Sequence, residues 1–82
     1  MIRLLIVDDE PLVQVGMKSI LDWSSYGIEI CAAVSNGSEA LLAIEKYRPE
    51  IVISDIRMPV MDGLQLLKTC RDRYGDLPVF IM

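Results

Sequence analysis

Acidic side chains follow two apolar runs of this sequence, at the point where each run stops. Asp8 and Asp9 come directly after residues 4–7, and Asp55 comes directly after residues 51–54. A short β-branched run bounded by turn signals predicts a strand that is buried on both faces. In an open α/β sheet, ligands bind beyond the carboxyl ends of such strands. We therefore expect the three aspartates to face a binding site and not a core.

Three carboxylates at one place would repel one another, and a bound divalent cation would remove this conflict. Oxygen ligands without a histidine or thiolate nearby favour Mg²⁺ over zinc, and the chain contains no histidine. A carboxylate beside such an ion can act as a nucleophile toward phosphorus, in a reaction that depends on positioning and on charge neutralisation by the metal. The acidic cluster thus predicts a Mg²⁺ site that serves phosphoryl transfer.

Aspartates also end strands and cap helices, and this alternative accounts for any one of them alone. It accounts less well for three that meet at adjacent strand ends, in front of the Met-Pro at 58–59 and the Asp-Gly at 62–63. We interpret Asp62 as a turn and helix-cap residue and not as a ligand. We expect Asp9 or Glu10 to cap the helix that follows them.

The rest of the chain alternates strands with helices. Strands are expected at residues 3–8, 29–34, 51–54 and 78–82, and helices at residues 11–22, 39–47 and 63–74. Pro11 suits the first turn of a helix, Ser38 is the expected N-cap of the second helix, and Pro49 ends it. With right-handed crossovers this gives one α/β domain over residues 1–82: a flavodoxin-like, doubly wound parallel sheet of strand order 2-1-3-4 with helices on both faces.

Helical spacing predicts which side chains of the second and third helices enter the core. For the second helix they are Ala40, Leu41, Ile44 and Tyr47. For the third they are Leu64, Leu67, Cys70 and Tyr74.

Length and composition limit the kind of protein. The 82 residues allow one small domain, and 52% apolar with 24% charged residues is typical of a globular chain. A net charge of −4 with scattered basic residues argues against a nucleic-acid surface, and the apolar run before Asp8 is too short for a signal peptide or membrane span. Cys31 and Cys70 lie in apolar patterns, which favours buried free thiols and a reducing cytoplasm.

The whole chain resembles the receiver domain of two-component response regulators. The resemblance rests on the acidic residues 8–10, the Asn36-Gly37 loop with Glu39-Ala40, Pro49, and the segment 55–63, Asp-Ile-Arg-Met-Pro-Val-Met-Asp-Gly. Within this family, the segments 20–23 (Ile-Leu-Asp-Trp) and 27–30 (Gly-Ile-Glu-Ile) are similar to receivers that precede an arabinose-regulator-type helix-turn-helix output domain.

The resemblance implies roles for the three clustered aspartates and for Arg57. Asp55 would be the phospho-acceptor and would take its phosphoryl group from a phosphohistidine on a sensor kinase. Asp9 and Asp55 would bind Mg²⁺ by side chain, Arg57 by its main-chain carbonyl, and Asp8 mainly through water. The protein would be a cytoplasmic signalling protein and not an enzyme, beyond weak self-catalysed phosphoryl transfer. It would regulate transcription through an output domain outside this chain, and DNA would be bound only by that domain.

Two residues of the family pattern have no counterpart in these 82 residues. Receivers carry a hydroxyl residue just past the fourth strand and a lysine at the end of a fifth, whereas this sequence stops at Met82. The chain therefore resembles roughly the first two-thirds of a receiver, without the fifth strand and the last two helices. The fourth strand would be an open edge beside exposed apolar area, so we expect self-association through that edge, exchange of elements between chains, or a marginal fold.

Three other functions stay open at this point. An aspartate-nucleophile phosphatase would need a second acid two residues beyond Asp55, where the chain has Arg57. A flavin or nucleotide binder would need a turn rich in Gly, Ser or Thr after the first strand, where the chain has residues 8–10. The main alternative is a non-phosphorylated interaction module that keeps the acidic pocket and does not signal.

Overall fold

The computed structural model describes residues 1–58 and 60–81, with only the backbone described at 80 and 81. The strands are β1 (Ile2–Val7), β2 (Ile28–Val34), β3 (Ile51–Ser54) and β4 (Val79–Ile81). The helices are α1 (Pro11–Ile20), α2 (Gly37–Tyr47), α3 (Gly63–Tyr74) and a short 3₁₀ helix, η1 (Trp23–Tyr26). The turn expected at Pro59 and the end of the fourth strand expected at Met82 lie outside the described residues.

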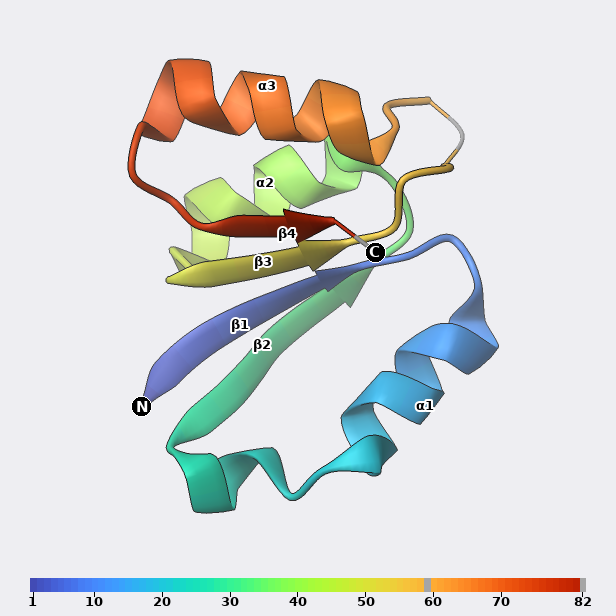
Figure 1. The fold of residues 1–82 in the computed structure, drawn as a ribbon, viewed down its shortest axis with the longest axis vertical. Coiled ribbons are helices and arrows are strands. Elements are labelled where there is room, and N and C mark those ends of the chain that lie inside the picture. Colours follow the sequence, from blue (N-terminus) through green and yellow to red (C-terminus); the bar gives the residue numbers. More distant parts are fainter. Residues whose placement is uncertain (59, 82) are drawn as a thin grey trace.

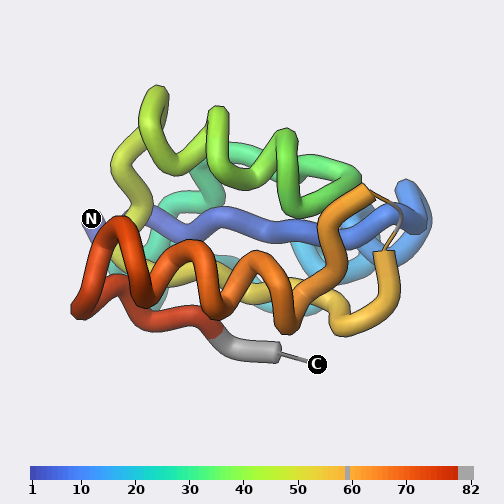
Figure 2. Tube along the Cα trace, turned by 90° about the horizontal axis from the view of Figure 1, so that it is seen from above, coloured from blue at the N-terminus to red at the C-terminus, as the bar shows by residue number. Residues whose placement is uncertain are grey.

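The four strands form one parallel sheet in the order β2-β1-β3-β4, which confirms the predicted topology. All strands point the same way, and their carboxyl ends lie at one edge of the sheet (Figure 1). The helices α2 and α3 run side by side across one face, and α1 lies on the other face (Figure 2). This arrangement is the doubly wound α/β fold, in which side chains at the carboxyl edge are free to meet a ligand.

The core lies between the sheet and the pair α2 and α3. The strands contribute the fully buried Leu5, Val7 and Val52. The helices contribute Ala40, Ala43, Ile44, Leu66 and Cys70. The predicted core face of α2 is confirmed, because Leu41 and Tyr47 also pack against this cluster. The free thiol of Cys70 is buried in it, and this burial raises the pKa of the thiol above its ordinary value.

The predicted face of α3 was wrong at Leu64, and Leu67 is half-buried without packing against the described core cluster. Leu64 is 58% exposed, whereas Leu66 is fully buried. The buried stripe therefore runs through Gly63, Leu66 and Cys70, at spacings of three and four residues, and Tyr74 packs against the core at the next turn. Leucines two positions apart can each be assigned to an apolar stripe by helical spacing, and packing in the core decides between them.

Helix ends follow local capping chemistry. Asn36, and not the expected Ser38, caps α2 by accepting a hydrogen bond from the backbone N–H of Glu39. Asp62 caps α3 as predicted, in a capping box with Gln65. Arg48 ends α2 in the left-handed conformation, one residue before Pro49.

Helix α1 is largely exposed. It ends at Ile20, earlier than predicted, and contains no buried residue. Val13 and Met17 are half-buried, but Ile20 is 73% exposed. The indole N–H of Trp23 donates to the Met17 carbonyl at 2.9 Å, so η1 is tied back to α1. None of the helices described in residues 1–58 and 60–81 has the length and apolar character of a membrane span.

Strand β4 is an outer strand of the described sheet. Self-association through its edge stays a prediction, which light scattering during size-exclusion chromatography would check: a monomer at every concentration would contradict it.

Two glycines provide a matched test of the fold. A Cβ at Gly63 would overlap the carbonyl oxygen of Asp55, whereas a Cβ at Gly16, inside α1, would meet nothing within 4 Å. We predict that Gly63→Ala lowers the free energy of unfolding by about 3 kcal/mol, because backbone must move. Gly16→Ala should raise it by about 0.5–1 kcal/mol, because the unfolded chain loses freedom. Urea unfolding measures both, and an unchanged stability in Gly63→Ala would contradict the packing described here.

Candidate metal centre

Three aspartates meet at the carboxyl edge of the sheet, as the sequence predicted. Carboxylate oxygens from Asp8, Asp9 and Asp55 lie within 4.8 Å of one another. The pairing of β1 with β3 places Val7 beside Ser54, so the next residues of both strands emerge together. The backbone N–H of Asp55 donates to the Val7 carbonyl at 2.9 Å, which continues the ladder to the site itself.

The three carboxylates differ in exposure. Asp8 is buried with 4% of its surface exposed, Asp55 is half-buried and Asp9 is exposed. The cluster therefore runs from the interior of the sheet to solvent. An ion bound there could keep water on its outer side, as Mg²⁺ does in proteins.

The carboxylate of Asp8 also shapes the chain around the site. Its Oδ1 accepts a hydrogen bond from the backbone N–H of Glu10 at 2.9 Å. The expected capping by Asp9 or Glu10 was wrong: Glu10 occupies the N-cap position of α1, but no side chain caps this helix. Asp8 instead closes a local turn, because its short side chain reaches the N–H two residues on. With one oxygen used in this way, Asp8 suits the indirect role that the family resemblance implies for it.

Arg57 lies beside the cluster. It lines an open cleft of about 540 Å³ together with Asp9, Ile56, Met58 and Asp62. Its side chain is exposed, which fits a residue whose main chain serves the site. The role of its carbonyl oxygen as a metal ligand stays a prediction.

Two backbone hydrogen bonds restrain the loop between β3 and α3: one joins its two ends and the other joins it to the start of α2. The N–H of Gly63 donates to the Ile56 carbonyl at 2.9 Å, and the N–H of Gly37 donates to the Met61 carbonyl at 3.0 Å. Between these points, Val60 has a φ of 70°, a conformation that β-branched residues rarely adopt. Its side chain is 78% exposed, so burial does not offset this strain. The two backbone hydrogen bonds hold the loop that borders the metal centre in place.

Sequence reasoning missed two residues that contact the site's backbone. The hydroxyl of Ser54, fully buried, donates to the Asp55 carbonyl at 2.9 Å. The side-chain amide of Gln14 donates to the carbonyls of Asp8 and Val34. The available signal for Gln14 was a polar residue on the face of α1 that also carries Val13 and Met17.

The donor set fits a hard divalent cation. All three side chains offer carboxylate oxygens, and one oxygen from each lies close enough to the others to share an ion. Few protein ligands, all of them oxygen, at a partly solvated edge suit Mg²⁺ better than zinc. Binding would also neutralise charges that the fold holds close together.

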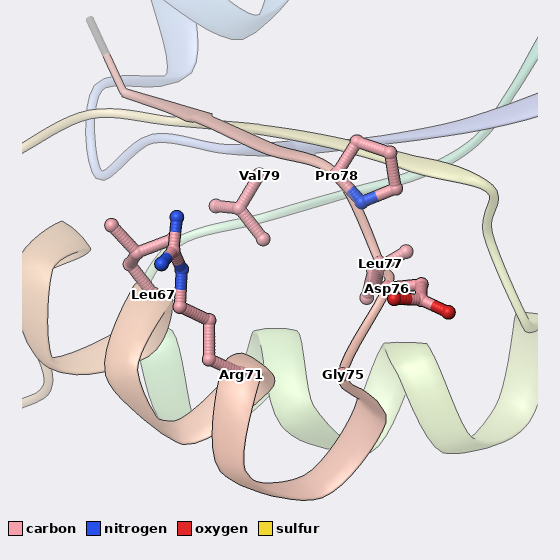
Figure 3. Close-up of a pocket in the computed structure, with 7 residues that line it drawn as sticks. All are labelled: Leu67, Arg71, Gly75, Asp76, Leu77, Pro78 and Val79. Carbon is pink, nitrogen blue, oxygen red and sulfur yellow. The ribbon is translucent and has the colours of Figure 1, made fainter.

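A second cavity lies away from this centre (Figure 3). It has a volume of about 420 Å³ and lies between α3 and the start of β4, at the end of the sheet opposite to the aspartates. The guanidinium of Arg71 extends toward Val79, while the carboxylate of Asp76 points away from the cavity (Figure 3). This lining gathers no group of acids, and we assign no ligand to it.

Comparison with known proteins points to one family. The family model described as "response regulator receiver domain" matches residues 4–82. The transcriptional regulatory protein YesN of Bacillus subtilis (strain 168), itself described as uncharacterized, is 43% identical over 68 residues, which cover 83% of this chain and 18% of that protein. The transcriptional regulatory protein HptR of Staphylococcus aureus (strain NCTC 8325 / PS 47) is 40% identical over 67 residues, 82% of this chain and 27% of that protein.

Solved structures give the same result. The receiver domain of the response regulator AraT from Geobacillus stearothermophilus has a TM-score of 0.89 at 32% identity, over 96% of this chain and 61% of that one. A two-component transcriptional regulator AraC from Clostridium phytofermentans ISDg has a TM-score of 0.89 at 32% identity, and the match covers 100% of this chain and 66% of that one. The chain spans less than a third of the length of the two curated relatives above.

The crowding of the carboxylates predicts a stability effect. We expect Asp55→Asn to raise the melting temperature without Mg²⁺ by about 5 °C, which corresponds to roughly 1 kcal/mol of relieved repulsion. Asp76→Asn removes the same charge away from the cluster and should have little effect. With saturating Mg²⁺ the parent should melt above Asp55→Asn, because it binds the ion more tightly and gains more stability from it. A metal-free mutant that melts below the parent would contradict the repulsion.

Proposed function

The chain belongs to the receiver domains of two-component response regulators, and on this premise we propose that Asp55 accepts a phosphoryl group while Mg²⁺ is bound in the acidic cluster. The observation that carries the proposal is the convergence of Asp8, Asp9 and Asp55 within 4.8 Å at one edge of the sheet. Asp55 comes from the end of β3 and is half-buried, so its carboxylate is held by the sheet and still reachable from solvent.

The proposed metal ligands are the side chains of Asp9 and Asp55 and the main-chain carbonyl of Arg57, with Asp8 acting through water. Mg²⁺, when bound, would neutralise the cluster and the charge of an incoming phosphoryl group. The exposed Asp9 and the open cleft beside Arg57 support entry from solvent.

The transfer needs little from the protein beyond positioning. A carboxylate oxygen of Asp55 forms a bond to phosphorus as the bond from phosphorus to the donor's imidazole nitrogen breaks. The electron pair of that bond leaves with the imidazole, and the product is an aspartyl phosphate. The ladder bond from the Asp55 N–H to Val7 holds the nucleophile's backbone during this step. The protein would thus be a phospho-acceptor with at most weak self-catalysed transfer, and not an enzyme with turnover.

The proposed donor is a phosphohistidine on a sensor histidine kinase. The proposed outcome is control of transcription through an output domain of the arabinose-regulator type, which alone would bind DNA. The likeness to transcriptional regulators in Bacillus and Staphylococcus supports this output. Two free thiols, Cys31 and Cys70, support a reducing cytoplasm as the site of action.

Two other reactions have weaker support. A phosphatase that uses an aspartate nucleophile needs an acid two residues beyond it, and Arg57 is exposed at that position. A nucleotide binder needs free N–H groups after β1, but the Glu10 N–H is already bound to Asp8.

Acetyl phosphate provides the direct test. We predict that incubation with acetyl phosphate and Mg²⁺ adds the mass of one phosphoryl group, and that peptide mapping places it at Asp55. Asp55→Ala should take up none, because no other residue stands at the end of β3 with a free carboxylate. Asp76→Ala is the matched control, since it removes a carboxylate outside the cluster.

Two results would contradict the assignment of Asp55 as the phospho-acceptor. If the parent takes up no phosphoryl group and shows no Mg²⁺-dependent change, the chain is an interaction module that keeps the acidic pocket without signalling. A phosphoryl group at Asp9 or Asp62 would overturn the assignment of the acceptor.

A further inference from the structure

Gln14 connects helix α1 to the strand ends that carry the acidic cluster. Its Nε2 donates one hydrogen bond to the Asp8 carbonyl at 2.7 Å and another to the Val34 carbonyl at 3.0 Å. The first carbonyl follows β1 and the second ends β2. One side chain therefore joins three elements at the edge of the sheet where the aspartates meet.

Both N–H groups of this amide are used, and both partners are backbone carbonyls. The N–H of Asp8 also donates to the Val34 carbonyl, at 2.9 Å. Gln14 thus extends the β1–β2 ladder by one further connection, beyond the point where β1 ends. A neutral side chain with two donors suits this position, because a carboxylate would face two carbonyl oxygens.

The hydrogen bond to Asp8 fixes the orientation of the next residue. The peptide group between Asp8 and Asp9 is planar, so a restrained Asp8 carbonyl also restrains the nitrogen and Cα of Asp9. On the other side of Asp9, the Glu10 N–H is bound to Asp8 Oδ1 at 2.9 Å. Asp9 is therefore held through both of its peptide groups, although its own side chain is exposed.

We propose that Gln14 is a positioning residue for Asp9, and that it sets the affinity of the acidic cluster for a divalent cation. The proposal rests on the proposed function, because it takes the cluster to be the Mg²⁺ site. Gln14 itself does not touch the ion. It acts through the peptide group that carries Asp9, as outer-shell partners orient metal ligands elsewhere.

The test replaces Gln14 by methionine, which has a similar length and no N–H donor. Mg²⁺ alone is titrated into the full chain by calorimetry. We predict that Gln14→Met weakens Mg²⁺ binding about tenfold, within the range typical of outer-shell substitutions. Val13→Ala is the matched control: it loosens the half-buried face of α1 without removing a side-chain hydrogen bond, and should change the affinity less than about twofold.

Amide hydrogen exchange without Mg²⁺ gives a second readout that does not depend on the metal. The N–H groups of Asp8 and Glu10 should exchange faster in Gln14→Met than in Val13→Ala. Gln14→Lys retains a donor and should restore their protection toward that of the parent. If Gln14→Met fails to fold, the comparison of Gln14→Lys with the parent decides: unprotected Asp8 and Glu10 amides in the lysine variant would overturn the proposal.

The outcomes separate this proposal from the proposed function. A parent that binds no Mg²⁺ would end the metal assignment, and the exchange rates would still decide whether Gln14 holds the Asp9 backbone. A parent that binds Mg²⁺ while Gln14→Met binds within twofold of it, or no more weakly than Val13→Ala does, would overturn the role of Gln14 alone.

Discussion

Repulsion among three carboxylates at the ends of β1 and β3 is the interaction that the rest of the structure must offset. Parallel pairing of these two strands brings Asp8, Asp9 and Asp55 to one edge, and this closeness is unfavourable while no cation is present. The ladder bond from Asp55 to Val7 and the turn that Asp8 closes on Glu10 hold the acids in place. The fold thus maintains a site that a divalent cation would stabilise.

Burial of apolar side chains just behind the site supplies the opposing stabilisation. Val7, the last residue of β1, is fully buried, and Leu66 of α3 packs in the same core. Each well-buried aliphatic side chain contributes about 1.5–3 kcal/mol relative to exposure, which can outweigh repulsion between partly solvated charges. The buried core therefore ends directly behind the acidic cluster, and hydrogen bonds hold the backbone of the residues beyond it.

Much of this arrangement could be predicted from the sequence, because its signals are local. The apolar runs predicted the strands, and their alternation with helices predicted a parallel sheet whose order follows from the doubly wound fold. The Asp-Gly at 62–63 predicted the α3 cap. The meeting of the three aspartates followed from strand order alone, since parallel strands bring their carboxyl ends to one edge. The roles of these residues toward metal and phosphate still await experiment.

The parts that could not be predicted depend on contacts between distant residues. Leu64 and Leu66 have the same chemistry, and only docking on the sheet buries the second. Asn36 and Ser38 are both good caps, and the backbone conformation at residue 36 selects the asparagine. Gln14 gave little local signal, because its partners lie on β2 and after β1. The positions of such residues depend on contacts that no short motif encodes.

A double-mutant cycle of Mg²⁺ affinity tests the central claim, that Asp9 and Asp55 share one ion, most directly. Calorimetric titration of the parent, Asp9→Asn, Asp55→Asn and the double variant gives the coupling between the two carboxylates. A shared ion predicts that each single change weakens binding at least about tenfold, and that the second change adds far less than it does alone. Losses that add independently, or single variants that bind Mg²⁺ as well as the parent does, would contradict a shared site.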